Sequence, residues 1–179
     1  MKESDKLSKK EVERASSNSD KNLIKLYKEN KKLLEQVNQV KKENKLTNED
    51  LLKIIKQHLP IPISIFKDSS PLESLVKYLK DNLNLGLSEI SSLLNRDQRT
   101  IWITYNNASK KKLVLDTSSK ITISLEFFSE RELSVLENLV DYLTDQKFSI
   151  SKISSLLNRD YKTIYTVYKR AKEKDAKSK

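Results

Sequence analysis

The chain has 179 residues, 36% hydrophobic and 34% charged, which suffices for one or two small domains but not for a large enzyme core. It contains no cysteine, so disulfides, thiolate catalysis and cysteine metal sites are excluded. No apolar run approaches the roughly 20 residues that span a bilayer, and the charged start of the chain is unlike a signal segment. We therefore expect a soluble, cytoplasmic protein without a membrane partner.

The net charge of +10 is unevenly placed along the chain. Residues 118–151 contain 3 Lys and Arg against 6 Asp and Glu, whereas residues 152–179 contain 9 against 3. A weaker contrast separates residues 61–87, with 3 against 3, from residues 88–112, with 5 against 2. Positive charge gathered in this way is typical of a surface that binds a polyanion. A solvated, lysine-rich surface is the alternative interpretation.

The N-terminal part of the chain is mostly polar over residues 1–19, and we expect a disordered tail there. Residues 20–46 follow with a heptad pattern that no proline or glycine interrupts, which is typical of a coiled coil. Asparagines at two a positions favour a parallel, in-register homodimer. The alternative is an amphipathic helix that packs on its own domain. The predicted dimerisation residues are Leu23, Leu26, Asn30, Leu33, Val37, Val40 and Asn44.

Short elements are predicted after the coiled coil. A helix is expected over 48–58, with Thr47 as its N-cap. The segments 61–66 and 121–125 alternate in character and are rich in β-branched residues, which predicts extended structure. Two questions stay open: whether these segments pair with each other, and whether residues 113–115 add a third extended piece.

An octapeptide, Ile-Ser-Ser-Leu-Leu-Asn-Arg-Asp, occurs at 90–97 and again 63 residues later at 153–160. The match extends upstream, where Ile-Pro-Ile-Ser at 61–64 faces Ile-Thr-Ile-Ser at 121–124. These correspondences indicate one module used twice. The predicted domains are a first repeat over 47–117, a second repeat over 118–174 and a basic tail over 175–179.

Three helices are predicted in each repeat. Apolar stripes place the first of them over 71–83 and over 130–145. Ser88 and Ser151 are the predicted N-caps of the second helix. The predicted fold class is therefore mostly α, with an N-terminal coiled coil followed by two pseudo-symmetric trihelical helix-turn-helix repeats with short extended segments.

The octapeptide predicts the turn between the second and third helices. Ser91 is small, which lets the third helix cross closely behind it, and Asn95 tolerates the left-handed conformation that ends a helix. Asp97 is predicted to cap the third helix. The outward triplets are then Gln98, Arg99 and Trp102 in the first repeat, and Tyr161, Lys162 and Tyr165 in the second. Trp102 and Tyr165 fit either a core role or a contact role.

This pattern resembles the helix-turn-helix of bacterial sigma factor region 4 and of response-regulator effector domains, which is roughly Glu-Ile-Ala-x-x-Leu-Gly-Val-Ser-x-x-Thr-Val. The matching positions are Ser91 and Ser154 at the small Ala, Asn95 and Asn158 at the turn glycine, Asp97 and Asp160 at the capping Ser, and Thr100 and Thr163 at the Thr. Arg96 and Arg159 depart from the apolar turn residue. Residues 61–174 also resemble uncharacterised tandem-repeat proteins of small archaea, a likeness that implies no function.

The resemblance implies binding of double-stranded DNA, because the third helix of such a motif enters the major groove. We expect a transcription regulator or a DNA-architectural protein. Duplex DNA is favoured over RNA. The alternative is a structural adaptor whose coiled coil oligomerises and whose repeats bind a protein partner, such as the transcription machinery. The predicted DNA-binding residues are Gln98, Arg99, Thr100, Trp102, Tyr161, Lys162, Thr163, Tyr165, Lys110, Lys111, Lys169 and Arg170, with further lysines, Lys112, Lys172 and Lys174, expected toward phosphates.

The sequence offers little for catalysis. It has one histidine, His58, and one glycine, Gly86, so it carries neither a histidine cluster nor a glycine-rich phosphate loop. Its carboxylates are spread over the predicted helices and form no acidic metal motif. We therefore predict no enzyme activity, no metal and no cofactor.

Overall fold

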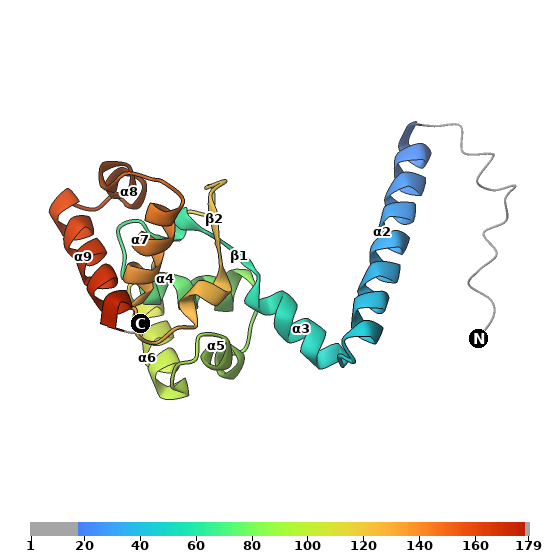
Figure 1. Ribbon diagram of the computed structural model, residues 1–179, viewed down its shortest axis with the longest axis horizontal. Coiled ribbons are helices and arrows are strands. Elements are labelled where there is room, and N and C mark those ends of the chain that lie inside the picture. The colour runs from blue at the N-terminus through green and yellow to red at the C-terminus, as the bar shows by residue number, and fades with distance from the viewer. Residues whose placement is uncertain (1–17, 178–179) are drawn as a thin grey trace, which may run out of the picture. The chain divides into compact units, whose positions relative to one another are not determined.

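A computed structural model describes the backbone of residues 18–177 and the side chains from residue 25 onward. The described part of the chain is mostly helical and includes a two-stranded sheet (Figure 1). It divides into two units, one ending at Leu52 and the other beginning at Lys53. The predicted N-terminal tail lies outside the described residues except for its last two, which begin a helix. Among the described residues, no helix combines the length and the apolar character that a membrane span requires.

The first unit contains the helix α2 (Asn18–Glu43) and the start of α3 (Asn48–Gln57), joined by a tight turn. α2 ends because Lys45 adopts a left-handed conformation, with φ of 54°, and the Leu46 N–H donates to the Lys41 carbonyl (3.0 Å). The predicted cap of α3 is confirmed: the Thr47 hydroxyl accepts from the Asp50 N–H (3.1 Å), and the Asp50 carboxylate accepts from the Thr47 N–H (2.9 Å).

The second unit contains two segments with the same order of elements. The first comprises β1 (Pro60–Pro62), the 3₁₀ turn η1 (Ile63–Phe66), α4 (Pro71–Lys77) continued by the π-helical turn η2 (Tyr78–Asn82), α5 (Leu87–Leu93) and α6 (Gln98–Lys110). The second comprises β2 (Thr122–Ser124), the 3₁₀ turn η3 (Leu125–Phe128), α7 (Val135–Asp145), α8 (Ile150–Leu157) and α9 (Tyr161–Lys177).

The helix predicted over 130–145 begins five residues later than expected, at Val135. Ser134 starts it through a capping box: its hydroxyl accepts from the Glu137 N–H (3.3 Å), and the Glu137 carboxylate accepts from the Ser134 N–H (2.7 Å). The helix predicted over 71–83 is present as α4 and η2, with a change to π-helical hydrogen bonding at Tyr78. The predicted apolar stripes are therefore confirmed, and the predicted start at residue 130 was wrong.

The strands β1 and β2 pair antiparallel, with Ile61 opposite Ile123. Two backbone hydrogen bonds extend this ribbon beyond the strands, from the Ile63 N–H to Ile121 O (3.1 Å) and from the Leu125 N–H to Leu59 O (3.0 Å). The two extended segments therefore pair with each other. Residues 113–115 do not form a further strand, and Val114 is 91% exposed.

The correspondence between the two extended segments is shifted by two residues from the predicted one. Residues 61–64 were matched with 121–124, but β1 and η1 occupy 60–66 whereas β2 and η3 occupy 122–128. Ile61 therefore corresponds to Ile123. Because side chains in extended structure alternate with a period of two, a shift of two residues keeps the same pattern, and the pattern alone cannot detect it.

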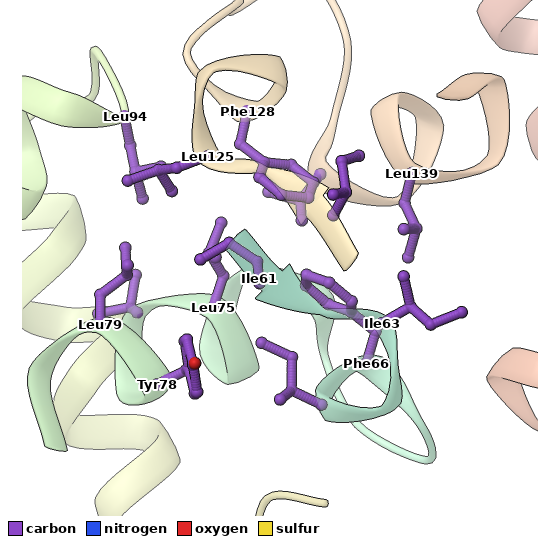
Figure 2. Close-up of a cluster of buried hydrophobic side chains, with 14 of the residues drawn as sticks. Ile61, Ile63, Phe66, Leu75, Tyr78, Leu79, Leu94, Leu125, Phe128 and Leu139 are labelled. Carbon is purple, nitrogen blue, oxygen red and sulfur yellow. The ribbon is translucent and has the colours of Figure 1, made fainter. Parts of the chain in front are cut away.

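The β1–α6 segment and the β2–α9 segment both contribute to one hydrophobic core (Figure 2). The rings of Phe66 and Phe128, both fully buried, lie 5.6 Å apart between centroids at the middle of this cluster. Burial of each such side chain contributes about 1.5–3 kcal/mol. Other fully buried members are Ile61, Ile63, Leu75, Leu79, Ile90, Leu94, Ile101, Ile123, Leu125, Leu139, Leu143, Ile153, Leu157 and Ile164. The third helix of each segment is thus held on the same core.

Candidate nucleic-acid interface

The turns that precede α6 and α9 have the same geometry. Asn95 and Asn158 both adopt left-handed conformations, with φ of 48° and 49°. The next residue closes the turn in each case, because the N–H of Arg96 donates to Ser91 O and that of Arg159 donates to Ser154 O, both at 3.0 Å. The prediction that these asparagines end a helix is confirmed.

A serine hydroxyl fastens each turn, which the sequence reasoning missed. The Ser91 hydroxyl donates to the Arg96 carbonyl (2.6 Å), and the Ser154 hydroxyl makes the equivalent bond to the Arg159 carbonyl. In the sequence, only the small size of these serines pointed to the turn. The hydroxyl satisfies a carbonyl in the turn between two helices that would otherwise need water, so it fixes the point from which the third helix departs.

The predicted cap of α6 is confirmed, and the Asp97 carboxylate accepts from the N–H groups of Arg99 (2.9 Å) and Thr100 (3.1 Å). At α9 the Asp160 carboxylate accepts from the Lys162 N–H (2.9 Å). A carboxylate here also interacts favourably with the positive end of the helix dipole. Both third helices therefore start at a defined residue.

The predicted caps of the second helices were wrong. Gly86, not Ser88, precedes α5, and its N–H donates to the Glu89 carboxylate (3.3 Å). At α8 the cap is Ser149, not Ser151, and its hydroxyl accepts from the Lys152 N–H (3.2 Å). Each helix begins two residues earlier than predicted.

The outward residues of α6 and α9 are exposed. Ile101 and Ile164 are fully buried and fix which face of each helix points outward. The predicted residues at the start of these helices, Gln98, Arg99, Thr100, Tyr161, Lys162 and Thr163, are all exposed. Trp102 is 57% exposed and Tyr165 is 42% exposed, so neither is a core residue.

The predicted phosphate-contacting cations fall into two groups. Lys110, Lys112, Lys169 and Arg170 are exposed. Lys111 instead reaches the Glu73 carboxylate (2.8 Å), and the equivalent Lys174 reaches Glu137 (2.7 Å). These pairs tie the end of α6 to α4 and the end of α9 to α7. Lys172 likewise contacts Asp141 (2.6 Å).

Glu137 is the more deeply placed carboxylate of the two lysine pairs, at 6% exposed. Burial raises the pKa of Glu137, but hydrogen bonds from Lys174 and from the N–H and hydroxyl of Ser134 outweigh it, so the net pKa lies below its usual value. Glu137 is therefore ionised at neutral pH and holds the cap of α7 and the end of α9 together.

The two turn arginines, which depart from the apolar family residue, face different neighbours. The Arg159 guanidinium donates to Ser69 O and lies near Asp68. Arg96 lies near Arg131 instead. Burial lowers the pKa of both guanidinium groups; Arg131 lowers that of Arg96 further, whereas Asp68 opposes the shift for Arg159. The same octapeptide thus occupies two electrostatic environments.

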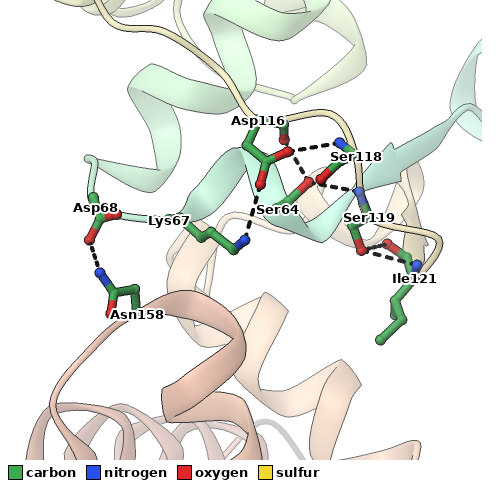
Figure 3. A network of polar contacts seen from close by, with 8 residues as sticks. All are labelled: Ser64, Lys67, Asp68, Asp116, Ser118, Ser119, Ile121 and Asn158. Carbon is green, nitrogen blue, oxygen red and sulfur yellow. Dashed lines mark hydrogen bonds and ion pairs between the residues drawn. The ribbon is translucent and has the colours of Figure 1, made fainter.

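A polar network fastens the linker between α6 and β2 to η1 (Figure 3). The buried Ser64 hydroxyl donates to the Asp116 carbonyl (2.6 Å) and accepts from the Ser119 N–H (3.2 Å). Hydrogen bonds from Ser118, then the Lys67 ammonium at 3.0 Å, lower the pKa of Asp116 to about 2. In the same view Asn158 donates to the Asp68 carboxylate (2.5 Å), which joins the second turn to the first segment.

The predicted dimerisation face of α2 is mostly exposed among the described residues. Among its members whose side chains are described, Leu26, Leu33 and Val40 are 54%, 58% and 46% exposed, Asn30 is exposed, and Val37 is half-buried. The helix predicted over 20–46 ends at Glu43, so Asn44 lies in the following turn, where its side-chain amide donates to the Val40 carbonyl (2.9 Å). The side chain of Leu23 lies outside the described residues. Tyr27 and Leu34, which stand next to this seam, are 58% and 63% exposed, so the apolar face is wider than the predicted one.

The described residues contain no group of three or more His, Cys, Asp or Glu side chains that could hold a metal ion. Comparisons of the chain with protein-family models, with curated proteins and with solved structures found no match. The features of this chain that bear on function are the geometry of α6 and α9 and the chemistry of their exposed residues.

Proposed function

We propose that the chain binds double-stranded DNA through α5–α6 and α8–α9, acting as two pseudo-symmetric helix-turn-helix units, and that it is a transcription regulator or a DNA-architectural protein. The observation that carries this proposal is that α6 and α9 each start after the same tight turn and expose their first three residues. In DNA-binding proteins of this kind, the N-terminal residues of the third helix contact base edges in the major groove.

The chemistry of the exposed residues suits these contacts. Arg99 offers the planar pair of donors that binds guanine, and Gln98 offers an amide that binds adenine. Thr100 and Thr163 offer hydroxyls to phosphates. Lys110, Lys112, Lys169 and Arg170 add exposed positive charge toward the ends of both helices.

The test is fluorescence anisotropy of the full chain with a random pool of labelled duplexes at several salt concentrations. If one chain neutralises about six phosphates, the slope of log affinity against log salt should be near −5. Absence of binding at low salt, or an affinity that does not respond to salt, would contradict the proposal and favour the adaptor.

We also propose that α2 forms a parallel coiled-coil homodimer. The support is the exposed seam of Leu26, Leu33 and Val40 together with Asn30, because paired asparagines at such a position favour in-register association. Multi-angle light scattering should give twice the chain mass of 20.8 kDa. Deletion of residues 1–46 should give a monomer. A full-length monomer at micromolar concentration would contradict this part of the proposal.

A specific observation favours the adaptor as a second candidate. Trp102 and Ile103 stand side by side in sequence on α6 and are 57% and 43% exposed. Exposed apolar residues gathered in this way are common at protein interfaces. If the chain is an adaptor, it should not bind DNA, and Trp102→Ala should abolish its capture of a protein partner. If the chain binds DNA, Trp102→Ala should weaken duplex binding.

A further inference from the structure

The outward face of α9 carries a ladder of two tyrosines and a lysine, one helical turn apart. The rings of Tyr161 and Tyr165 lie almost parallel, at 8°, with centroids 6.3 Å apart. They are 52% and 42% exposed. The Lys169 ammonium lies 5.1 Å from the centroid of Tyr165 and extends the ladder. Two nearly parallel tyrosine rings are thus exposed to solvent next to the Lys169 ammonium.

The charge on this face is of one sign. From Tyr161 to Lys172 the chain contains four cationic residues and no carboxylate, and three of those cations, Lys162, Lys169 and Arg170, are exposed. Lys172 is drawn to Asp141 on α7. Parallel aromatic rings next to unopposed cations make up the kind of surface on which unpaired bases stack while their phosphates are neutralised.

The corresponding face of α6 lacks this ladder. Gln98 and Asn106 occupy the positions of Tyr161 and Lys169, and Trp102 stands alone at the position of Tyr165. Amide groups suit the edges of paired bases. In a duplex, each base is stacked between its neighbours, which cover its faces. The tyrosine rings of α9 can therefore stack only on unpaired bases that are outside the duplex stack.

We propose that the Tyr161–Tyr165–Lys169 face of α9 binds unpaired DNA nucleotides next to the duplex that α6 contacts. The inference rests on the proposed DNA-binding function and deepens it, because the preferred ligand becomes a junction between duplex and single strand. The bases stack on the tyrosine rings, and Lys162, Lys169 and Arg170 neutralise the phosphates of the unpaired strand.

The experiment compares three ligands of the full chain at one salt concentration: a blunt duplex, the same duplex with a short unpaired overhang, and the same overhang with abasic nucleotides. The overhang should raise the affinity about tenfold, since stacking of a base on an aromatic side chain is worth about that factor or more. The abasic overhang, which keeps the phosphates, should return the affinity to near the blunt value. An overhang base replaced by 2-aminopurine should lose fluorescence on binding, because stacking quenches it.

Variants at equivalent positions of the two helices separate stacking from general binding. Tyr165→Ala should bring the ratio of overhang to blunt affinity close to one and leave the 2-aminopurine signal unquenched. Tyr165→Phe keeps the ring and should keep the ratio. Trp102→Ala, at the matching position of α6, should lower the affinity for both ligands and leave the ratio unchanged. Circular dichroism confirms that each variant is folded.

Equal affinity for blunt and overhang duplexes, with unquenched 2-aminopurine, would overturn the inference while leaving duplex binding in place. The inference would also be overturned by an advantage that persists on the abasic overhang, since phosphates alone would then explain it. If Tyr165→Phe lowered the ratio of overhang to blunt affinity as much as Tyr165→Ala, the effect would belong to the hydroxyl and not to the ring. That result would also overturn the inference. Absence of binding to any duplex would overturn both this inference and the proposed function.

Discussion

The helices α6 and α9 follow the same eight residues and the same kind of turn and are preceded by equivalent aspartates, but their outward faces differ in chemistry. α6 presents an amide, a guanidinium and an indole, whereas α9 presents two phenols and ammonium groups. The residues that build the turn are identical, and the residues that point away from it are not. The comparison indicates that the scaffold positions two helices while each exposed face is free to take a different ligand.

The turns before α6 and α9 have the same sequence but different neighbours. Asn158 donates to Asp68, and Arg159 lies beside the same carboxylate, whereas Arg96 lies beside Arg131. These neighbours come from the loop that precedes the first helix of the other segment. An identical peptide therefore acquires a different electrostatic environment from the segment it packs against, which its own sequence does not encode.

The largest expected effect tests whether the two segments are one cooperative unit. Phe66→Ala and Phe128→Ala should each destabilise the fold by about 3–5 kcal/mol, because each leaves a cavity in a fully buried cluster. Since the two rings share one core, both variants should unfold in a single transition in urea, followed by circular dichroism. Two separate transitions, or loss of signal from one segment alone, would show that the segments are independent.

A smaller effect should separate the roles of α6 and α9 in DNA binding. Arg99→Ala should cost about 1–3 kcal/mol on a preferred duplex and much less on random DNA, because it removes a contact to base edges. Lys162→Ala should weaken both by similar amounts and reduce the salt slope by about one, because it removes a phosphate contact. Anisotropy titrations of both variants on both ligands measure this. The roles would be reversed if Lys162→Ala alone abolished sequence preference.

The smallest effect compares the two turns. Asn95→Gly should be neutral or slightly stabilising, because glycine adopts a left-handed conformation at no steric cost. Asn158→Gly also loses the hydrogen bond to Asp68 and should be less stable than Asn95→Gly by about 0.5–1 kcal/mol. Urea denaturation gives both values. In an Asp68→Ala background the difference should vanish, and a difference that persists would mean that the hydrogen bond is not its cause.

The local features of the fold were predictable because their causes are adjacent in sequence. The left-handed Asn95, the cap at Asp97 and the cap at Thr47 each depend on residues within one helical turn. The same is true of the apolar stripes that mark the first helix of each segment. The exposure of Arg99 follows from the burial of Ile101, because the two residues lie on nearly opposite sides of α6.

Other features depend on contacts between distant residues and could not be predicted. Phe66 meets Phe128, and Lys111 meets Glu73, across long stretches of chain. The start of α8 was misplaced because Ser149 and Ser151 are both capable caps, and nothing local distinguishes them. Helical spacing places Tyr161 next to Tyr165, but the angle between their rings and their exposure depend on side-chain conformation and on what packs against α9.

The register of the ribbon has a consequence for the expected target. Ile61 lies opposite Ile123, its counterpart in the other segment, as identical residues would across the axis of a symmetric dimer. In such a dimer both halves change together, and a matching DNA site must be palindromic. Here both halves belong to one chain, so each can be substituted alone, as α6 and α9 have been. The target expected for one chain therefore has two unlike parts in a fixed order, one for α6 and one for α9, and a bound chain would mark a direction along the DNA.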